Sequence, residues 1–185
     1  METLWSDFIN SEWHDWKGSG RSEDRLGQEK WQRYFLTQWQ LPAPVPADED
    51  TVAAMRSFRE RLHGMSVRLA AGKTLSEEDF AYLNSILDKG AVKRRIEPES
   101  GSIRMRLLGV GENWEQVMAE VAASFADMLI RGEGARIRVC ENPDCRWIFY
   151  DDTRNRTKKY CDHKMCGNLM KVRRFRAKRR EEGRS

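Results

Sequence analysis

Residues 140–180 read CENPDCRWIFYDDTRNRTKKYCDHKMCGNLMKVRRFRAKRR, and they decide the fold of the C-terminal part of this chain. All four cysteines of the protein lie here, in two pairs: Cys140, Cys145, Cys161 and Cys166. Four residues separate the members of each pair, and fifteen separate the pairs. Two short cysteine loops of this kind bring four thiolates to one tetrahedral Zn²⁺ ion. The spacing therefore predicts one zinc site with four cysteine ligands.

The predicted zinc is structural, because four thiolates complete its tetrahedral shell and leave no position for water or a substrate. His163 lies between the second pair of cysteines and is an alternative ligand. The start of the chain lacks the basic and apolar regions of a signal peptide, and no apolar run approaches the roughly 20 residues of a membrane span. We therefore expect a cytoplasmic protein without membrane contact, in which reduced thiols favour metal over disulfides.

Patterns on both sides of the cysteine loops predict a treble-clef-like zinc finger. Residues 136–139 are strand-like and lead into Cys140, and residues 146–150 are strand-like and follow Cys145. Cys166 opens a segment with helical periodicity. A cysteine in the first turn of a helix is a favoured zinc ligand, because the backbone N–H groups and the helix dipole stabilise its thiolate.

The helix after Cys166 combines a short apolar series with many cations. Leu169, Val172 and Phe175 recur every three positions, and we expect them to pack back onto the finger. The remaining faces of the helix carry Lys and Arg.

Charge is divided unevenly along the chain. Residues 140–185 hold 14 Lys or Arg against 7 Asp or Glu, whereas residues 1–139 hold 19 against 22. Such a basic segment commonly binds a phosphate backbone, so we predict contacts with nucleic acid, with a solvated charged surface as the alternative. The predicted contact residues lie in the loop before Cys161 and in the helix: Arg154, Arg156, Lys158, Lys159, Lys171, Arg173, Arg174 and Lys178.

The rest of the chain is mostly helical in pattern. Ser22 is the predicted N-cap of a helix that includes Trp31 and Trp39, and Ser76 with Asp79 predicts a capping box for a later helix. Alternating residues on both sides of Gly101 predict a β-hairpin. The predicted fold class is α+β. A mostly helical N-terminal domain with a small β-hairpin spans residues 1–132, and a treble-clef-like four-cysteine zinc finger that ends in a basic helix spans residues 136–181.

Three residues near the N-terminus are candidates for binding a small-molecule effector. Trp5, Asp7 and Asn10 lie on the first predicted helix, and ligand pockets combine aromatic residues with a few polar groups. The alternative is that Trp5 belongs to the core and that the two polar side chains cap or bond within the helix. The three histidines are scattered, and no phosphate-binding glycine loop or nucleophile elbow is present, so we expect no enzyme.

The cysteine-rich segment resembles a known family. Cys140 to Cys145, Arg154-Asn155-Arg156 and Cys166-Gly167-Asn168 are similar to the CGNR zinc finger of bacterial proteins. Asp7-Phe8-Ile9-Asn10 resembles an early motif of the ABATE domain, which precedes this finger in the family. The resemblance implies a ligand-binding N-terminal domain in a stress-induced transcription regulator. Leu169 departs from the motif, because the family has an arginine at this position.

These observations lead to one main functional hypothesis and two alternatives. The main hypothesis is a DNA-binding transcription regulator with an N-terminal sensing or dimerising domain. A homodimer would place two fingers on DNA and supply the area that a single short module lacks. The alternatives are an RNA- or ribosome-associated factor, and a protein-interaction module in which the zinc finger is purely structural.

Overall fold

Five helices build the N-terminal body of the computed structural model, which describes residues 3–99 and 101–182. They are α1 (Leu4–Ile9), α2 (Glu29–Trp39), α3 (Glu49–Ala70), α4 (Glu77–Leu87) and α5 (Trp114–Ile130). Thr3 and Ser76 open α1 and α4 with capping boxes, and the second of these confirms the prediction from the sequence. Asp48 and Asn113 accept hydrogen bonds at the starts of α3 and α5, so local chemistry fixes where these helices begin.

The short helix α1 lies at the centre of the body and is covered by α3 and α5. Phe8 of α1 packs against Phe35 of α2 and Phe58 of α3, with ring centroids 5.8 Å and 5.5 Å away. On the other side of α1, Trp5 packs edge-on against Phe125 of α5. The aromatic residues of the N-terminal region are therefore mainly core residues.

Three antiparallel hairpins accompany the helices. They are β1 (Glu12–His14) with β2 (Ser22–Asp24), β3 (Val92–Glu99) with β4 (Ser102–Gly109), and β5 (Ile137–Val139) with β6 (Ile148–Tyr150). The second of these is the hairpin predicted from the sequence. The predicted N-cap at Ser22 is wrong, because Ser22 pairs with His14 in β2 and α2 begins only at Glu29.

The hairpin β5–β6 is part of the same core as the helices. Ile137 and Ile148 are fully buried, and they belong to one continuous hydrophobic cluster with the residues of α1, α3 and α5. A short 3₁₀ turn (Gly134–Arg136) leads from the body into β5 and contacts α3. The N-terminal half of the finger is therefore joined to the body by shared apolar packing.

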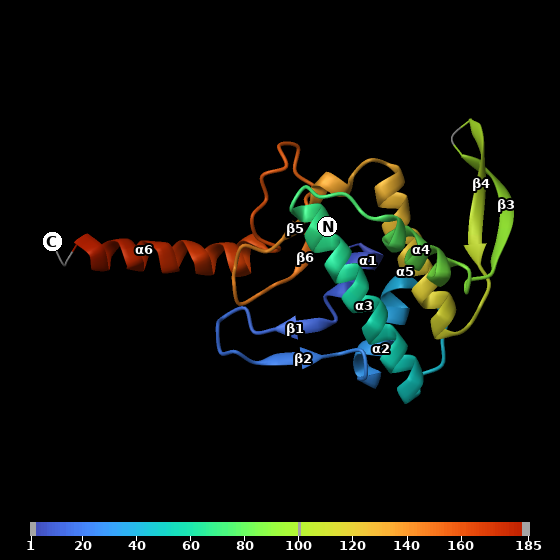
Figure 1. Cartoon of the computed structure of the whole chain (residues 1–185), viewed down its shortest axis with the longest axis horizontal. Helices are drawn as coiled ribbons and strands as arrows, with labels where there is room; N and C mark the ends of the chain where they lie inside the picture. Colours follow the sequence, from blue (N-terminus) through green and yellow to red (C-terminus); the bar gives the residue numbers. More distant parts are fainter. Residues whose placement is uncertain (1–2, 100, 183–185) are drawn as a thin grey trace.

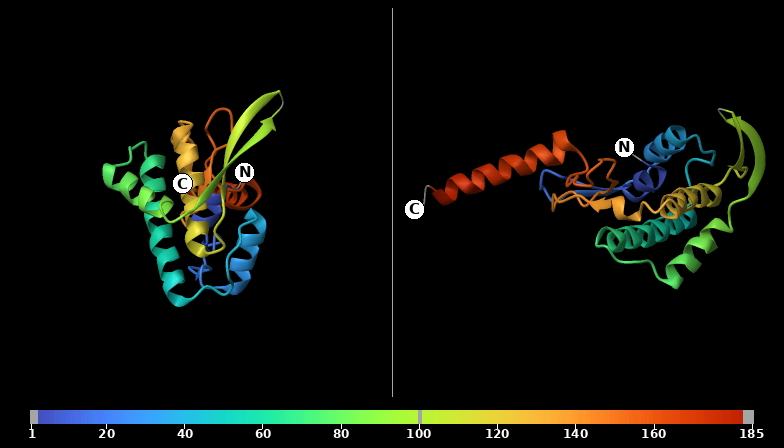
Figure 2. Two further views of the ribbon diagram at one scale, coloured as in Figure 1. Left: turned by 90° about the vertical axis from the view of Figure 1, so that its right-hand side faces the viewer. Right: turned by 90° about the horizontal axis from the view of Figure 1, so that it is seen from above.

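Two elements project from opposite ends of the molecule (Figures 1 and 2). The helix α6 (Asn168–Glu182) extends from one end, and the hairpin β3–β4 stands at the other. None of the described residues of α6 is buried. The prediction that Val172 and Phe175 pack onto the finger is therefore wrong, and Phe175 remains 60% exposed, because α6 leaves the body within its first turns.

The chain is an α+β protein, with mixed helices and small antiparallel hairpins and with its four cysteines gathered before the last helix. Among residues 3–99 and 101–182, no helix combines the length and the apolar character that crossing a membrane requires.

Candidate zinc centre and basic helix

The four cysteine sulfur atoms lie at one point between β5, β6 and α6. All of them are within 4.8 Å of one another. The Sγ atoms of Cys145 and Cys161 are 3.6 Å apart, and those of Cys161 and Cys166 are 3.9 Å apart. A tetrahedral zinc with Zn–S bonds of about 2.3 Å separates its sulfur ligands by about 3.8 Å. The donor set and its spacing therefore fit one structural Zn²⁺ ion.

Two kinds of backbone turn position these sulfur atoms. In the first, the N–H of Cys140 donates to the carbonyl of Trp147, and the N–H of Cys145 donates to the carbonyl of Asn142. In the second, Cys166 lies in a single π-helical turn (His163–Gly167) that runs directly into α6. The first turn thus fixes one pair of thiolates, and the start of α6 carries the last one.

The charges of the four thiols are strongly interdependent. Hydrogen bonds from Cys145 and Cys161 lower the pKa of Cys140 to about 2. Hydrogen bonds to the sulfur atoms of Cys140 and Cys145, followed by burial, raise the pKa of the Cys161 thiol. Bound Zn²⁺ would supply the positive charge that holds all four as thiolates, with release of their protons.

Asn142 is a part of the centre that the sequence did not reveal. Its side chain is fully buried, and Nδ2 donates to Cys166 Sγ at 3.3 Å and to the carbonyl of Trp16 at 2.9 Å. One amide therefore links a zinc ligand to the loop between β1 and β2. Its position between the first two cysteines is the only signal in the sequence, and many residue types are compatible with that position.

Other polar contacts also attach the finger to the body. The guanidinium of Arg173 in α6 donates to Asp144 at 2.7 Å and to the carbonyl of Lys17 at 3.0 Å. Asn10 exchanges two hydrogen bonds with the backbone of Ile148 in β6: its Nδ2 donates at 2.8 Å, and its Oδ1 accepts at 3.0 Å. The loop between Cys140 and Cys145, β6 and α6 are therefore each joined to the N-terminal segment by side-chain hydrogen bonds.

The eight predicted nucleic-acid contacts fall into two groups. Five already have partners within the protein. Besides Arg173, Arg174 donates to Tyr160 Oη at 3.2 Å, and Lys158 lies over the Phe149 ring with its side chain only 17% exposed. Lys159 and Lys178 form exposed ion pairs with Glu141 and Glu182.

The second group consists of Arg154, Arg156 and Lys171. All three are exposed, and their side chains form no ion pair within the described part of the chain. Further along α6, Arg176, Arg179 and Arg180 are exposed as well.

The three candidate effector residues do not line the same cavity. Trp5 is buried against Phe125. Asp7 Oδ2 accepts a hydrogen bond of 2.7 Å from Trp39 Nε1. Asp7 and Asn10 line one cavity of about 490 Å³, together with Trp31 and Tyr34 of α2 and Trp147 of the finger. Trp5 instead borders a different cavity of about 300 Å³.

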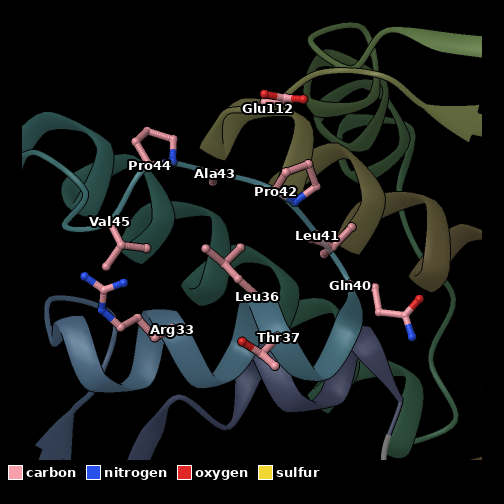
Figure 3. A pocket seen from close by; sticks show the side chains of 10 residues that line it. All are labelled: Arg33, Leu36, Thr37, Gln40, Leu41, Pro42, Ala43, Pro44, Val45 and Glu112. Atoms are coloured by element: carbon pink, nitrogen blue, oxygen red, sulfur yellow. The ribbon is translucent and has the colours of Figure 1, made fainter.

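A larger and open hollow of about 940 Å³ lies on the body, away from these residues. Figure 3 shows Arg33, Leu36 and Thr37 of α2 on one side and the chain from Gln40 to Val45 across from them. None of the residues predicted from the sequence lines this hollow.

Comparison with known families matches both parts of the chain. Residues 2–132 match the profile of the family ABATE, described as "Putative stress-induced transcription regulator". The chain belongs to the ABATE family. In this ABATE protein, residues 136–179 match the CGNR zinc finger, which includes all four cysteines. No curated protein matches the chain. The resemblance recognised in the sequence is thus confirmed, and Leu169, its one departure, is half-buried at the start of α6.

Proposed function

We propose that this ABATE protein is a cytoplasmic, non-catalytic transcription regulator that binds DNA through the finger. The observation that carries the proposal is the position of α6. It projects from the body with none of its described residues buried, and cations occupy its surface on all sides. A helix that is separate from the body in this way can approach DNA without a clash between the body and the duplex.

The length and charge of α6 support this role. Its fifteen residues span about 22 Å, which is enough to follow a groove across several base pairs. Between Lys171 and Arg180 the helix has seven cations and no acid, so its own charges repel one another. Phosphate contacts would relieve this repulsion and release counterions.

We propose that the predicted contact residues have two different roles, phosphate contact and positioning. Arg154 and Arg156 in the loop and Lys171 in the helix contact phosphates, and Arg174 and Lys178 join them once their weak intramolecular contacts are exchanged. Arg173 and Lys158 instead position the helix and the loop, because Arg173 bridges to Asp144 and Lys158 is largely covered by Phe149.

The test is a fluorescence-anisotropy titration of a labelled DNA duplex with the zinc-loaded full chain at several salt concentrations. The double variant Arg154→Gln/Lys171→Gln is expected to reduce the slope of log affinity against log salt by about two, because each phosphate contact contributes about 0.9. The matched control is Lys30→Gln/Lys73→Gln, which removes two exposed cations from the body and is expected to leave the slope unchanged.

Two outcomes would replace this proposal with another. Tighter binding to a structured RNA than to duplex DNA at the same salt would favour an RNA- or ribosome-associated factor. The absence of salt-dependent binding to either would favour a protein-interaction module with a structural finger.

We also propose that residues 1–132 sense an effector and residues 136–181 respond to it, with the cavity of Asp7 and Asn10 as the effector site. Support comes from Asn10, which lines the cavity and bonds to β6, and from Trp147, which lines it from the finger. The indole N–H of Trp147 is buried and has no hydrogen-bond partner among the described residues. An effector with an acceptor group would satisfy it.

The test is a thermal-shift screen of small polar metabolites, repeated on Trp147→Phe, which keeps an aromatic ring and removes the N–H. Trp13→Phe is the control, because Trp13 lies outside the cavity. A stabilising compound whose effect is equal in all three proteins would exclude this site.

A further inference from the structure

The hairpin β3–β4 has one apolar face and one charged face. Residues that pair across the two strands share a face, and the register joins Ile96 to Met105 and Pro98 to Ile103. Six apolar side chains therefore lie on the same side, with Arg94 among them: Val92, Ile96, Pro98, Ile103, Met105 and Leu107. The opposite side carries mostly charged residues: Lys93, Arg95, Glu97, Glu99, Arg104 and Arg106.

The apolar face is not covered by the body. Ile103 is 81% exposed and Ile96 is 71% exposed, and Met105 and Leu107 are also mostly exposed. Within the described residues, β3 and β4 pair only with each other and stand at the edge of the molecule (Figures 1 and 2). A two-stranded hairpin is at best marginally stable in water unless a face is packed. Its sequence therefore indicates a partner for this face.

The charged face, in contrast, contains two ion pairs of its own. Arg104 pairs with Glu99 at 2.8 Å, and Arg106 pairs with Glu97 at 3.5 Å. These pairs tie the two strands together on the side that water covers. The charged face thus has ion pairs of its own, whereas the apolar face has exposed side chains that another surface could bury.

The size of the apolar face is that of half a small interface. A large apolar side chain offers on the order of 100 Å² for burial, so six give about 600 Å². This is at the upper limit of the largest apolar patch on a typical monomer. Two such faces packed together would bury about 1,200 Å², which is the lower limit for a specific stable interface.

We propose that this face is the dimer interface of the protein, and that its partner is the same face of a second copy. Two hairpins would pack face to face across a two-fold axis, with their sheets about 10 Å apart. A self-matching apolar surface is typical of homodimers, whereas interfaces between independently folded partners are more polar.

Arg94, the charged residue on the apolar face, favours one alignment of the two copies. A parallel arrangement would place the two Arg94 side chains opposite each other, whereas an antiparallel arrangement places each of them toward the tip half of its partner.

The dimer would hold the two basic helices far apart. Figure 1 shows α6 and β3–β4 at opposite ends, so pairing through the hairpins places both α6 helices at the outer ends of the assembly. The proposal does not depend on which nucleic acid α6 binds, and a failure of DNA binding would leave it intact.

The test is sedimentation velocity of the zinc-loaded full chain over a range of concentrations. The wild type is expected to be a dimer at micromolar concentration. The variant Ile96→Thr/Met105→Thr keeps residues with strand propensity on the apolar face and is expected to raise the dimer dissociation constant about a hundredfold or more. The matched control Lys93→Thr/Arg95→Thr changes the charged face and is expected to remain a dimer.

Circular dichroism and zinc content show that each variant is folded. The proposal is overturned by a wild type that stays monomeric up to about 100 μM, by a dimer that Ile96→Thr/Met105→Thr leaves unchanged, or by an apolar face that binds only a different protein.

Discussion

The two halves of the finger are held by different forces. The first half, residues 136–150, is anchored by Ile137 and Ile148, which are fully buried in the core of the body. The second half, from Tyr160 to Glu182, is held within the described residues by the small cluster of the cysteines, Tyr160 and Met170 and by a few polar contacts. The comparison shows what zinc is needed for in this chain. Zinc joins the basic loop before Cys161 and the helix α6 to the hairpin β5–β6, which already packs against the body.

Removal of zinc is expected to give the largest effect and to separate the two halves. Chelation, or the variant Cys161→Ser, should abolish amide protection in the second half, because apparent binding energies of structural zinc are about 10 kcal/mol or more. Residues 137–139 and 148–150 should keep most of their protection. Hydrogen exchange with mass spectrometry measures both segments in one experiment. Equal loss of protection in both halves would contradict the division described above.

Truncation of the apolar anchor is expected to act on the whole molecule. Ile148→Ala should lower the free energy of unfolding by about 3 kcal/mol, because it opens a cavity in the shared core. Phe175→Ala is the matched control in the second half and should change this free energy by less than about 0.5 kcal/mol, since its ring is exposed. Denaturant unfolding followed by tryptophan fluorescence measures both variants.

Asp151 stabilises the loop between the two halves in a manner that depends on pH. Burial alone would raise the pKa of this carboxyl, but hydrogen bonds from Thr153 and from the Lys158 N–H outweigh burial, so the pKa is lowered. Asp151→Asn should cost about 2 kcal/mol at pH 7.

The difference between Asp151→Asn and the wild type should depend on pH with a definite sign. A lowered folded pKa stabilises the protein above the unfolded value, near 3.8, and this stabilisation is lost as the pH falls through the folded value. The difference should therefore persist down to about pH 4 and shrink below it. Both chains carry zinc, and the zinc content is measured at each pH so that only points with bound metal are compared. A difference that disappears above pH 5 would contradict the assignment.

The hydrogen bonds of Asn10 test the polar part of the anchor. Asn10→Ala leaves the N–H and the carbonyl of Ile148 without their side-chain partner and should cost about 1.5 kcal/mol. Asn10→Asp keeps an acceptor for the N–H of Ile148 and loses the donor, so its cost should differ from that of the alanine variant. Chemical denaturation measures both. A cost near zero for both variants would show that the apolar anchor is sufficient.

The smallest expected effect is that of Arg173→Ala. Its ion pair with Asp144 is partly exposed, and such pairs contribute about 1 kcal/mol or less. Global stability should hardly change, but amide exchange in the first turns of α6 should become faster. Arg176→Ala is the control and should change neither quantity. Identical exchange in the two variants would exclude a positioning role for Arg173.

Several features of the protein follow from the sequence alone. The spacing of Cys140, Cys145, Cys161 and Cys166 predicts the zinc site, because two tight loops and a tetrahedral ion restrict the geometry locally. The capping box at Ser76 and the alternation around Gly101 likewise predict a helix start and a hairpin, because both depend on neighbouring residues. The uneven distribution of charge is also a property of the sequence.

Other features are decided only by the tertiary structure. The burial of Ile148, the bridging amide of Asn142 and the partner of Arg173 each depend on which surfaces meet, and the partners are more than 20 residues apart in the chain. The exposure of Val172 and Phe175 has the same origin, since periodicity marks an apolar series without showing whether another surface covers it. Local chemistry thus determined the metal site, and long-range packing determined what that site holds in place.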